Sequence, residues 1–449
     1  MSSPKRFLIL IFMFAFAQQL LSQDLKLTSG AADRESLALY ESGEWKALLA
    51  YCNHAISDSV DGYEIRYRAG QACYHLKKYM KAVLHFNEAL AFCAGDPLAE
   101  EYLFNSYLEL DRFEDARRVL EQLPEEQREA FRKRLSHHYR VKGETGPLFS
   151  NEMAKTDTLD LDGTDNLYGE ADITQDGYCI NAGVARDFNG GFGLCIEYTF
   201  VKLNKNKMVQ AGDSLAADDL YPLTQNQLYA SGMIPVGKNY TVLPAFHYTT
   251  ERYTTIAPRL SPDSAGYIFP VEMFIAGSWI GYLSITRDLR IIRASVFGAF
   301  SDLNDKNQYQ GGFQVVAYPL GNLKFYTSTK LLDHINDGDH NFIFEQVAGG
   351  RIYRRLWAEI SATLGNMENY HENNAAVVYN LAERITFKSG AKLIYSFDPR
   401  WTVNAEYLYF KRAGQYVQYI QGEGDSIVKT DKEMDFNNQV VLLGLTFNF

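Results

Sequence analysis

From about residue 166 to the last residue, apolar and polar side chains alternate along the chain, and this pattern restricts the fold more than any other feature. The segment 401–409 places Trp, Val, Ala, Tyr and Tyr on one face, with Thr, Asn and Glu on the other, and segments 323–331 and 356–364 alternate in the same way. Successive side chains of a strand point to opposite faces, so the pattern predicts antiparallel strands. A soluble sandwich and a membrane barrel share this alternation, which alone does not distinguish them.

The connections between the predicted strands favour a membrane barrel. Short turns are expected at 189–191, 237–239, 287–289, 321–322 and 398–400, and long polar connections at 204–224, 254–270, 365–383 and 412–435. Short turns at one rim and long loops at the other are typical of outer-membrane barrels. Tyr and Phe also concentrate near strand ends, as the two aromatic girdles of such barrels require.

The last strand supports the same interpretation. Val441, Leu443, Leu445, Phe447 and the terminal Phe449 share one face, and Gly444 lies on the other. This end resembles the C-terminal assembly signal of outer-membrane proteins, which ends in an aromatic residue. The resemblance assigns that signal to Gly444, Phe447 and Phe449. Leu442 departs from it, because the family prefers a polar residue there.

We predict an antiparallel transmembrane β-barrel of fourteen strands over residues 166–449, with twelve strands as the alternative because the first hairpin is weak. The predicted strands are 166–174, 177–187, 192–203, 225–235, 240–252, 271–286, 290–302, 308–318, 323–333, 341–350, 356–365, 384–397, 401–411 and 436–449. An even number returns the chain to the rim where the barrel begins.

Charged residues of both signs fall on the face that the alternation assigns to the lumen. They are Glu197, Lys324, Lys330, Glu359, Arg384, Lys388, Lys392 and Glu406. A mixed set of this kind either lines a water-filled pore or pairs across the interior and closes it. A barrel of this size allows both outcomes.

The N-terminus predicts export. Lys5 and Arg6 precede an apolar run over 7–17, and polar residues follow, which is the pattern of a secretory signal peptide at 1–23. Cleavage after Ala17 and cleavage after Ser22 both fit. The run is too short to span a bilayer, and no Cys follows it to carry a lipid anchor.

Residues 30–146 contain a repeat with an interval of 34 residues. Trp45, Tyr79 and Phe113 recur at that interval, as do Leu48, Ala82 and Ala116 in the same helices. The pattern resembles the tetratricopeptide repeat (TPR), which implies a short α-helical solenoid. Phe104 at a small-residue position and the missing prolines depart from the family. A cap helix is expected over 125–139, and residues 147–165 are expected to link the two domains.

The TPR resemblance implies a groove on the first helix of each repeat that binds a protein partner. By repeat position, the groove residues would be Tyr40, Glu41, Tyr67, Gln71, Tyr74, His75, Glu101 and Asn105. Repeats of this kind bind partners and do not catalyse reactions.

The five cysteines predict no disulfide scaffold. Cys52, Cys73 and Cys93 are expected to be free thiols, with a Cys52–Cys73 bridge as the alternative. In the barrel, the expected register places Cys195 opposite Val184 and Cys179 opposite Phe200, so these two thiols should be too far apart to bond.

Neither catalysis nor nucleic-acid binding is expected. The net charge of −11 leaves no basic excess for nucleic acid. His247 shares a face with Thr249 and Glu251, but no nucleophile motif surrounds it, and the acidic spacing of 333–340 does not fit a regular calcium loop. We therefore expect no enzyme activity, cofactor or metal.

The two halves together resemble the repeat-plus-barrel proteins of the YaiO type, in architecture more than in specific motifs. The resemblance implies a protein of the outer membrane of a Gram-negative bacterium, with its N-terminal domain in the periplasm. Expected partners are outer-membrane lipid, a periplasmic protein and, during biogenesis, the barrel-assembly machinery. The leading hypothesis is translocation or cell-envelope assembly of polysaccharide or protein. The alternative is a non-conducting anchor that only binds a partner.

Overall fold

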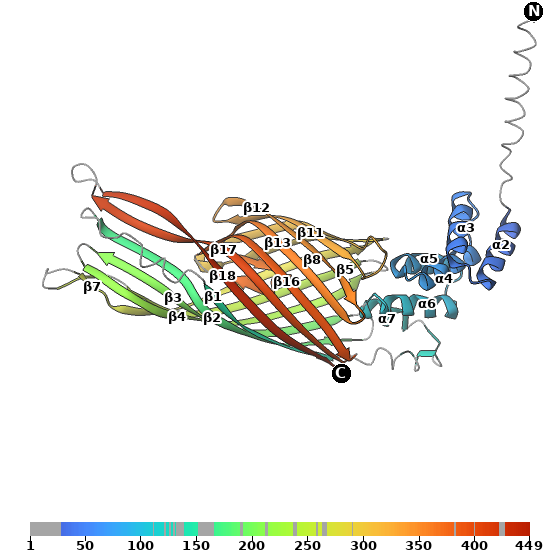
Figure 1. Cartoon of the computed structure of the whole chain (residues 1–449), viewed down its shortest axis with the longest axis horizontal. Coiled ribbons are helices and arrows are strands. Elements are labelled where there is room, and N and C mark those ends of the chain that lie inside the picture. Colours follow the sequence, from blue (N-terminus) through green and yellow to red (C-terminus); the bar gives the residue numbers. More distant parts are fainter. Residues whose placement is uncertain are drawn as a thin grey trace, which may run out of the picture. The chain divides into compact units, whose positions relative to one another are not determined.

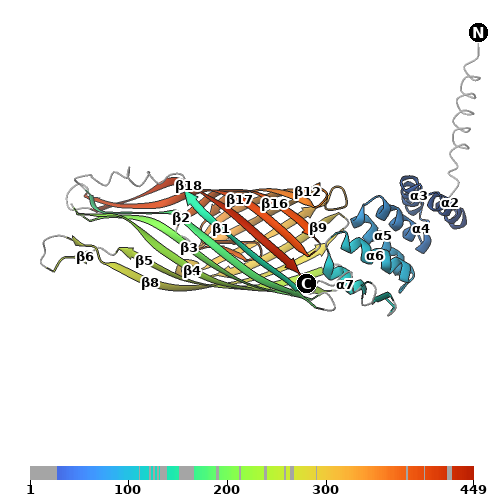
Figure 2. The same ribbon diagram turned by 60° about the horizontal axis from the view of Figure 1, so that its bottom comes forward.

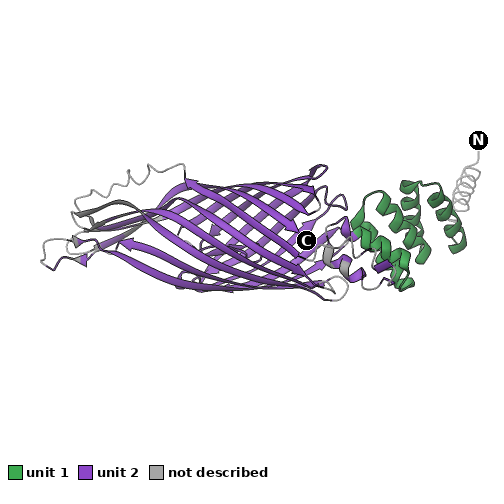
Figure 3. Ribbon diagram, turned by 90° about the horizontal axis from the view of Figure 1, so that it is seen from below, with its two compact units in different colours: residues 1–106 green, residues 107–449 purple. Residues whose placement is uncertain are grey.

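A computed structural model describes residues 28–110, 112–120, 123–124, 127–128, 131, 139–150, 166–188, 192–211, 214–236, 240–256, 259–262, 267–289, 291–380, 383–398, 400–421 and 427–449. The chain divides into two compact units, residues 1–106 and 107–449 (Figure 3). Helices form the first unit and a closed antiparallel barrel dominates the second, as the sequence predicts. The signal peptide, most of the cap helix, the linker over 151–165 and the turn at 189–191 lie outside the described residues.

The helices follow the predicted repeat. They are α2 (Ser29–Glu41), α3 (Trp45–Ser57), α4 (Tyr63–His75), α5 (Tyr79–Phe92), α6 (Pro97–Leu108) and α7 (Phe113–Leu120), of which α7 belongs to the second unit (Figure 1). The recurring aromatics Trp45, Tyr79 and Phe113 each begin the second helix of a pair. None of the described helices is long and apolar enough to cross a membrane.

Small residues let the paired helices approach closely. A Cβ added at Gly70 on α4 would lie 2.6 Å from the ring of Phe86 on α5, so this position accepts no side chain without a shift of the ring. Leu48, Cys52 and Cys73 are fully buried in the same core. The 34-residue pattern thus marks the contacts that hold the helix pairs together.

Fourteen strands close the barrel. They are β1 (Tyr139–Ser150), β2 (Asn166–Asp187), β3 (Gly193–Ala211), β4 (Ser214–Val236), β5 (Tyr240–Ile256), β8 (Val271–Asp288), β9 (Ile292–Ser301), β10 (Gln308–Ala317), β11 (Tyr326–Asn336), β12 (Asp339–Tyr353), β13 (Leu356–Met367), β16 (Arg384–Asp398), β17 (Trp401–Gln421) and β18 (Ile427–Asn448). Consecutive members of this series are neighbours, and β1 pairs with β18 to close the ring. The strands cross the barrel at a marked tilt (Figure 2).

The predicted first hairpin is wrong. Residues 166–174 and 177–187 form the single strand β2, with a bulge between Thr174 and Asp176, and the additional strand is β1, inside the stretch assigned to the repeats and linker. Pro147 concealed β1, because proline usually marks the end of an element. It is tolerated because the pairing of β1 with β18 skips Gly146 and Pro147, so no hydrogen bond from a Pro147 N–H is needed there.

Two expected long loops are mostly strand. The region 204–224 is largely β3 and β4, and the region 412–435 is largely β17 and β18, so these strands reach past the ends of β12 and β13 (Figure 1). Beyond the end of β16, β17 pairs with β2 over residues 416–420. Past the ends of the other strands, β2–β5, β8, β17 and β18 continue as a sheet. We call this sheet the distal extension.

The outer surface of the barrel carries two groups of aromatic contacts. Phe246, Trp279, Phe300 and Tyr309 form a continuous series on β5, β8, β9 and β10. At the rim where the chain ends, Phe449 stacks on Tyr139, and Phe447 contacts Trp401. Exposed apolar side chains such as Leu283, Val296 and Leu443 lie between these levels. The surface is that of an outer-membrane-type barrel, an apolar band between two aromatic girdles.

The cysteines are free thiols. Cys195 lies opposite Ala185 and Cys179 opposite Val201, one residue away from the expected register. The alternative Cys52–Cys73 bridge is not present, and both side chains are packed in the helical core. Outside the membrane, burial raises the pKa of Cys52 to about 11 and that of Cys73 to about 12.

Candidate functional site

The connection between β13 and β16 folds into the barrel interior, where the sequence predicted an exposed loop. It contains the short strands β14 (Tyr370–Glu372) and β15 (Val377–Tyr379), which pair with each other. We call residues 368–380 the interior hairpin. Tyr370 and Ala375 are fully buried, and His371 and Glu372 are buried as well. A polar stretch between strands predicts a loop, but polar side chains are equally compatible with the polar inside of a barrel.

The tip of the interior hairpin is held by one side of the barrel wall. His247 Nδ1 lies 2.7 Å from the Ala375 carbonyl oxygen. The hydroxyl of Tyr282 donates to Asn374 Oδ1 at 2.8 Å, and that of Tyr229 donates to the Asn374 carbonyl at 3.2 Å. His247, for which the sequence predicted no catalytic role, thus contacts the hairpin backbone.

The tip itself has an unusual backbone. Asn373, Asn374 and Ala375 have φ values of 52°, 58° and 67°, in the left-handed region. Asparagine adopts this region more easily than other residues with a Cβ, whereas alanine is disfavoured there. Surrounding contacts must therefore hold Ala375 in place, and its carbonyl is the one that His247 contacts.

Ion pairs and amide contacts hold the sides of the interior hairpin. Glu372 pairs with Lys388 on β16 and accepts a hydrogen bond from the Tyr379 hydroxyl at 2.7 Å. Asn380 Nδ2 donates to Glu251 Oε1 on β5 at 2.6 Å. Lys388 was predicted to face the lumen, but Glu372 was missed because nothing in the local pattern distinguishes an inserted loop from an exposed one.

The base of the interior hairpin is also anchored. Where the chain returns to β16, Glu383 forms a buried ion pair with Arg412 at 2.8 Å and accepts hydrogen bonds from the Thr174 amide and hydroxyl, both at 2.7 Å. At the other end, His334 Nε2 lies 2.7 Å from the Glu368 carbonyl oxygen. The hairpin is therefore connected to β4, β5, β8, β11 and β16.

A cavity of about 510 Å³ remains between the interior hairpin and the opposite wall. Five of the eight predicted lumen residues line it: Glu197, Glu359, Lys388, Lys392 and Glu406. Most of the charges in this wall are neutralised locally, because Lys142 pairs with Glu197 at 2.6 Å and Lys392 with Glu406 at 2.9 Å. Glu359 accepts a hydrogen bond from the Tyr326 hydroxyl.

The other three predicted lumen residues do not line this cavity, although Lys330 is among the buried, inward-facing residues of β11. Lys330 is buried, with its ammonium 4.8 Å from the centre of the Phe297 ring. Lys324 is exposed in the turn before β11, which begins later than predicted. Arg384 pairs with Glu433, because the bulge between Ile385 and Phe387 adds a residue and reverses the faces of β16 at this point.

Part of the cavity wall is apolar, which the charge pattern did not predict. Leu442, the departure from the C-terminal signal, packs with Leu148, Leu408 and Val440 and lines the cavity beside Val378 of the hairpin. A leucine fits at this position because the interior hairpin, and not water alone, faces it. Among the described residues, no group of three His, Cys, Asp or Glu side chains is arranged to hold a metal.

On the helical unit, three of the predicted groove residues meet. Gln71 Nε2 on α4 donates to the Tyr67 hydroxyl at 3.0 Å and to the Tyr40 hydroxyl on α2 at 3.5 Å. Gln71 is buried, and its Oε1 has no hydrogen-bond partner. Burial raises the pKa of the Tyr67 hydroxyl, and the nearby hydroxyls of Tyr102 and Tyr40 raise it further, so it remains a neutral donor.

Aromatic contacts continue this face onto α6. The Tyr102 ring lies 6.2 Å from Tyr67 and 5.3 Å from Tyr74. Tyr102 was not predicted, because it falls one position after the repeat equivalent of Tyr67. His75 stacks on Trp45 at 4.0 Å, while Glu41, Glu101 and Asn105 lie on the same helices as exposed or half-buried side chains. We call Tyr40, Tyr67, Gln71, Tyr74 and Tyr102 the tyrosine face.

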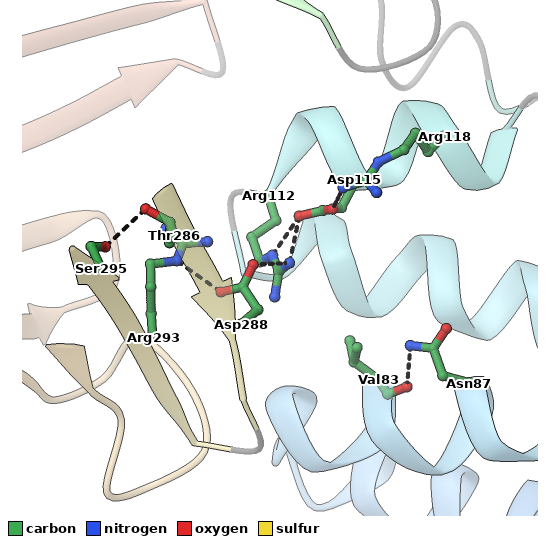
Figure 4. A network of polar contacts seen from close by, with 9 residues as sticks. All are labelled: Val83, Asn87, Arg112, Asp115, Arg118, Thr286, Asp288, Arg293 and Ser295. Carbon is green, nitrogen blue, oxygen red and sulfur yellow. Dashed lines mark hydrogen bonds and ion pairs between the residues drawn. The ribbon is translucent and has the colours of Figure 1, made fainter. Parts of the chain in front are cut away.

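Within the second unit, an ion-pair network ties α7 to the barrel. Arg112, just before α7, pairs with Asp115 and with Asp288 at the end of β8, both at 2.6 Å (Figure 4). Asp288 also pairs with Arg293 on β9 at 2.8 Å. Burial would lower the pKa of Arg112, but the two carboxylates outweigh it and raise that pKa, so the guanidinium remains charged.

No family model matches the chain, and no curated protein matches it. The translocator domain of the autotransporter NalP from Neisseria meningitidis is 9% identical over 72% of this chain and 95% of its own, with a TM-score of 0.29. The KdgM porin in complex with disordered oligogalacturonate is 9% identical over 63% and 98%, with a TM-score of 0.26.

The helices resemble the Yersinia enterocolitica type III secretion chaperone SycD in complex with a peptide of the translocator YopD, which is 12% identical over 24% of this chain and 86% of its own, with a TM-score of 0.21. Likenesses at this level assign neither a family nor a function, and membership of the YaiO type stays a prediction.

Proposed function

We propose that the chain is an outer-membrane anchor that presents a partner-binding TPR-like domain, and that its barrel is closed to solute flow in the state described. The interior hairpin carries this proposal. It occupies the lumen, and buried contacts from β5, β8, β11 and β16 hold it, while Arg412 on β17 pairs with Glu383 just after it. Paired charges in the remaining wall favour a closed interior over a water-filled pore.

The predicted export signal, together with the position of the helices before the first strand, supports a periplasmic location for the helical unit. In this orientation the rim with Phe449 faces the periplasm and the distal extension faces the outside of the cell. The interior hairpin then enters the lumen from the outer side.

The tyrosine face suggests the chemistry of the partner. Its hydroxyls and the orphan Gln71 Oε1 offer acceptors, and Glu41 and Glu101 add negative charge on the same helices. None of the eight predicted groove residues is Lys or Arg. Tyrosine rings and carboxylates together favour cationic side chains, so we propose an extended partner segment that carries Lys or Arg.

A second candidate is gated passage, the leading hypothesis from the sequence. The cavity beside the interior hairpin favours it, because the hairpin forms one wall of this cavity and its displacement would enlarge it. In the anchor proposal the hairpin stays in place, whereas in the passage proposal a partner or substrate moves it.

Single-channel recording in planar bilayers distinguishes the anchor proposal from the passage proposal. The wild-type chain should show no stable ion conductance, and replacing residues 369–379 by a short Gly-Ser linker should produce steady open channels. The matched control is Lys411→Gln, which removes an exposed ion pair with Asp435 outside the lumen. The barrel of this variant should stay closed to ions. Stable conductance by the wild type would contradict the anchor proposal and favour passage.

A further inference from the structure

The edge of β8 in the distal extension has no strand partner among the described residues. β5 pairs with β8 along its whole length, from Val271 to Arg287. On the other side β9 is shorter, and its pairing with β8 begins only at Ile280. Residues 271–278 therefore form an edge strand. They lie beyond Trp279 and its aromatic girdle, outside the apolar band of the barrel.

The direction of the free backbone groups can be read from one pair of hydrogen bonds. The Trp279 amide donates to Asp302 Oδ1 at 2.6 Å, and the Trp279 carbonyl accepts from the Asp302 amide at 3.3 Å. Both groups of Trp279 thus point away from β5. Backbone groups alternate along a strand, and the β5–β8 register is unbroken, so those of Met273, Ile275 and Gly277 point to the free edge.

The side chains of this edge are apolar and exposed. Ile275 is 75% exposed, Val271 58% and Met273 55%, all on the outer face. On the inner face, Phe274 stacks on Tyr253 with ring centres 5.6 Å apart. The only charge within 271–279 is Glu272, which Arg259 neutralises in an ion pair.

The opposite edge of the same extension is built differently. The pairing of β1 with β18 ends at Asn438, and residues 427–437 of β18 continue past it. This edge carries five charged residues: Lys429, Asp431, Lys432, Glu433 and Asp435. Charges on an edge strand discourage pairing with other chains. The β8 edge has no such protection beyond Pro270 at its start.

We propose that the β8 edge is a strand-addition site, which binds an extended segment of a partner protein through its free backbone groups. The segment would add a strand beside residues 271–278, with apolar side chains at alternate positions that continue the stripe of Val271, Met273 and Ile275. The site is independent of the tyrosine face and of the state of the lumen.

A second copy of this chain fits the edge poorly. Antiparallel pairing of two identical β8 edges needs a two-fold axis perpendicular to the strands, which would turn one barrel upside down in the membrane. Parallel pairing about an axis along the membrane normal would continue the apolar outer face of one copy into the inner face of the other, which carries Glu272 and Ser278.

The test uses the full chain in detergent micelles and a fluorescein-labelled decapeptide of alternating Val and Thr, with binding measured by fluorescence anisotropy. Ile275→Pro removes a free-edge N–H without removing a hydrogen bond to β5. It should weaken binding about fivefold or more, the cost of losing one net hydrogen bond. Ile275→Thr keeps the N–H and should bind within about threefold of wild type. Heat-modifiable migration confirms that both variants are folded.

Amide hydrogen exchange by NMR gives an independent result. Without peptide, Met273, Ile275 and Gly277 should exchange faster than Phe274 and Ala276, and the peptide should slow them. The proposal is overturned by failure of the peptide to bind the wild type, by unchanged binding to Ile275→Pro, or by protected edge amides in the chain alone. A wild-type dimer that Ile275→Pro dissociates would show that the occupant is a second copy, which also overturns it.

Discussion

Removal of the Glu372 charge should release the interior hairpin. The carboxylate of Glu372 and the ammonium of Lys388 pair inside the barrel, where the two side chains are only 5% and 10% exposed. In Glu372→Gln the ammonium of Lys388 would remain buried without the carboxylate that it pairs with, while the hairpin stays in place. When the hairpin leaves, water can reach that ammonium, so the substitution favours the released state.

The magnitude follows from the burial of the pair. Breaking a buried ion pair by removing one partner costs about 3–5 kcal/mol. The lower end applies here, because the Gln amide oxygen can still accept the hydrogen bond of the Tyr379 hydroxyl. A cost of about 3 kcal/mol shifts the equilibrium between packed and released hairpin by roughly a hundredfold.

Hydrogen exchange of the backbone amides of Tyr370–Glu372 and Val377–Tyr379 measures this shift, with the amides of β13 as an internal reference. Glu372→Gln should speed exchange of the hairpin amides by about two orders of magnitude and leave β13 unchanged. The double variant Glu372→Gln/Lys388→Met removes the orphaned charge and should recover most of the protection. Exchange in Glu372→Gln within threefold of wild type would refute the view that this ion pair holds the hairpin.

Three further predictions use the rest of the chain. Phe449→Ser should reduce the yield of folded barrel, because the last strand loses its aromatic contact at the rim and its assembly signal; unchanged heat-modifiable migration would contradict this. A protease site within 213–220 should be cut from outside intact cells and one within 398–400 should not, and the reverse result would invert the proposed orientation. At pH 8, buried Cys73, with its pKa raised to about 12, should have roughly one thiolate in 10⁴ molecules and resist iodoacetamide, whereas exposed Cys93 reacts; mass spectrometry of the alkylated chain measures both.

The sequence predicted the barrel well because strand alternation is a local signal. The strands from β3 to β18 and the pairing of β17 with β18 follow from patterns within about ten residues. The same locality explains the errors at the start of the barrel. Pro147 and the polar stretch around Asp176 suggest breaks, but whether a strand tolerates a proline or a bulge depends on neighbours that lie far away in the chain.

The candidate site was only partly predictable for the same reason. Residues on regular strands, such as Glu197 and Lys392, could be assigned to the interior by alternation. The interior hairpin could not be assigned to the interior in this way, because its sequence has no periodicity. Its contacts with His247 and Tyr282 join distant parts of the sequence. Among the repeats, the 34-residue interval located Tyr67 and Gln71, whereas Tyr102 lies outside the repeat pattern.

The interior hairpin also has a consequence for the order of folding. Its contacts with His247 and Tyr229 join residues 128 and 145 positions apart, and the ring closes only when β1 meets β18 near the end of the chain. Contacts between such distant residues form late and slowly. The hairpin precedes β16, β17 and β18 in the chain, so it is available before the strands that close the ring. We therefore expect the hairpin to be in place while the seam is still open, so that its side chains act as the template around which the last strands assemble.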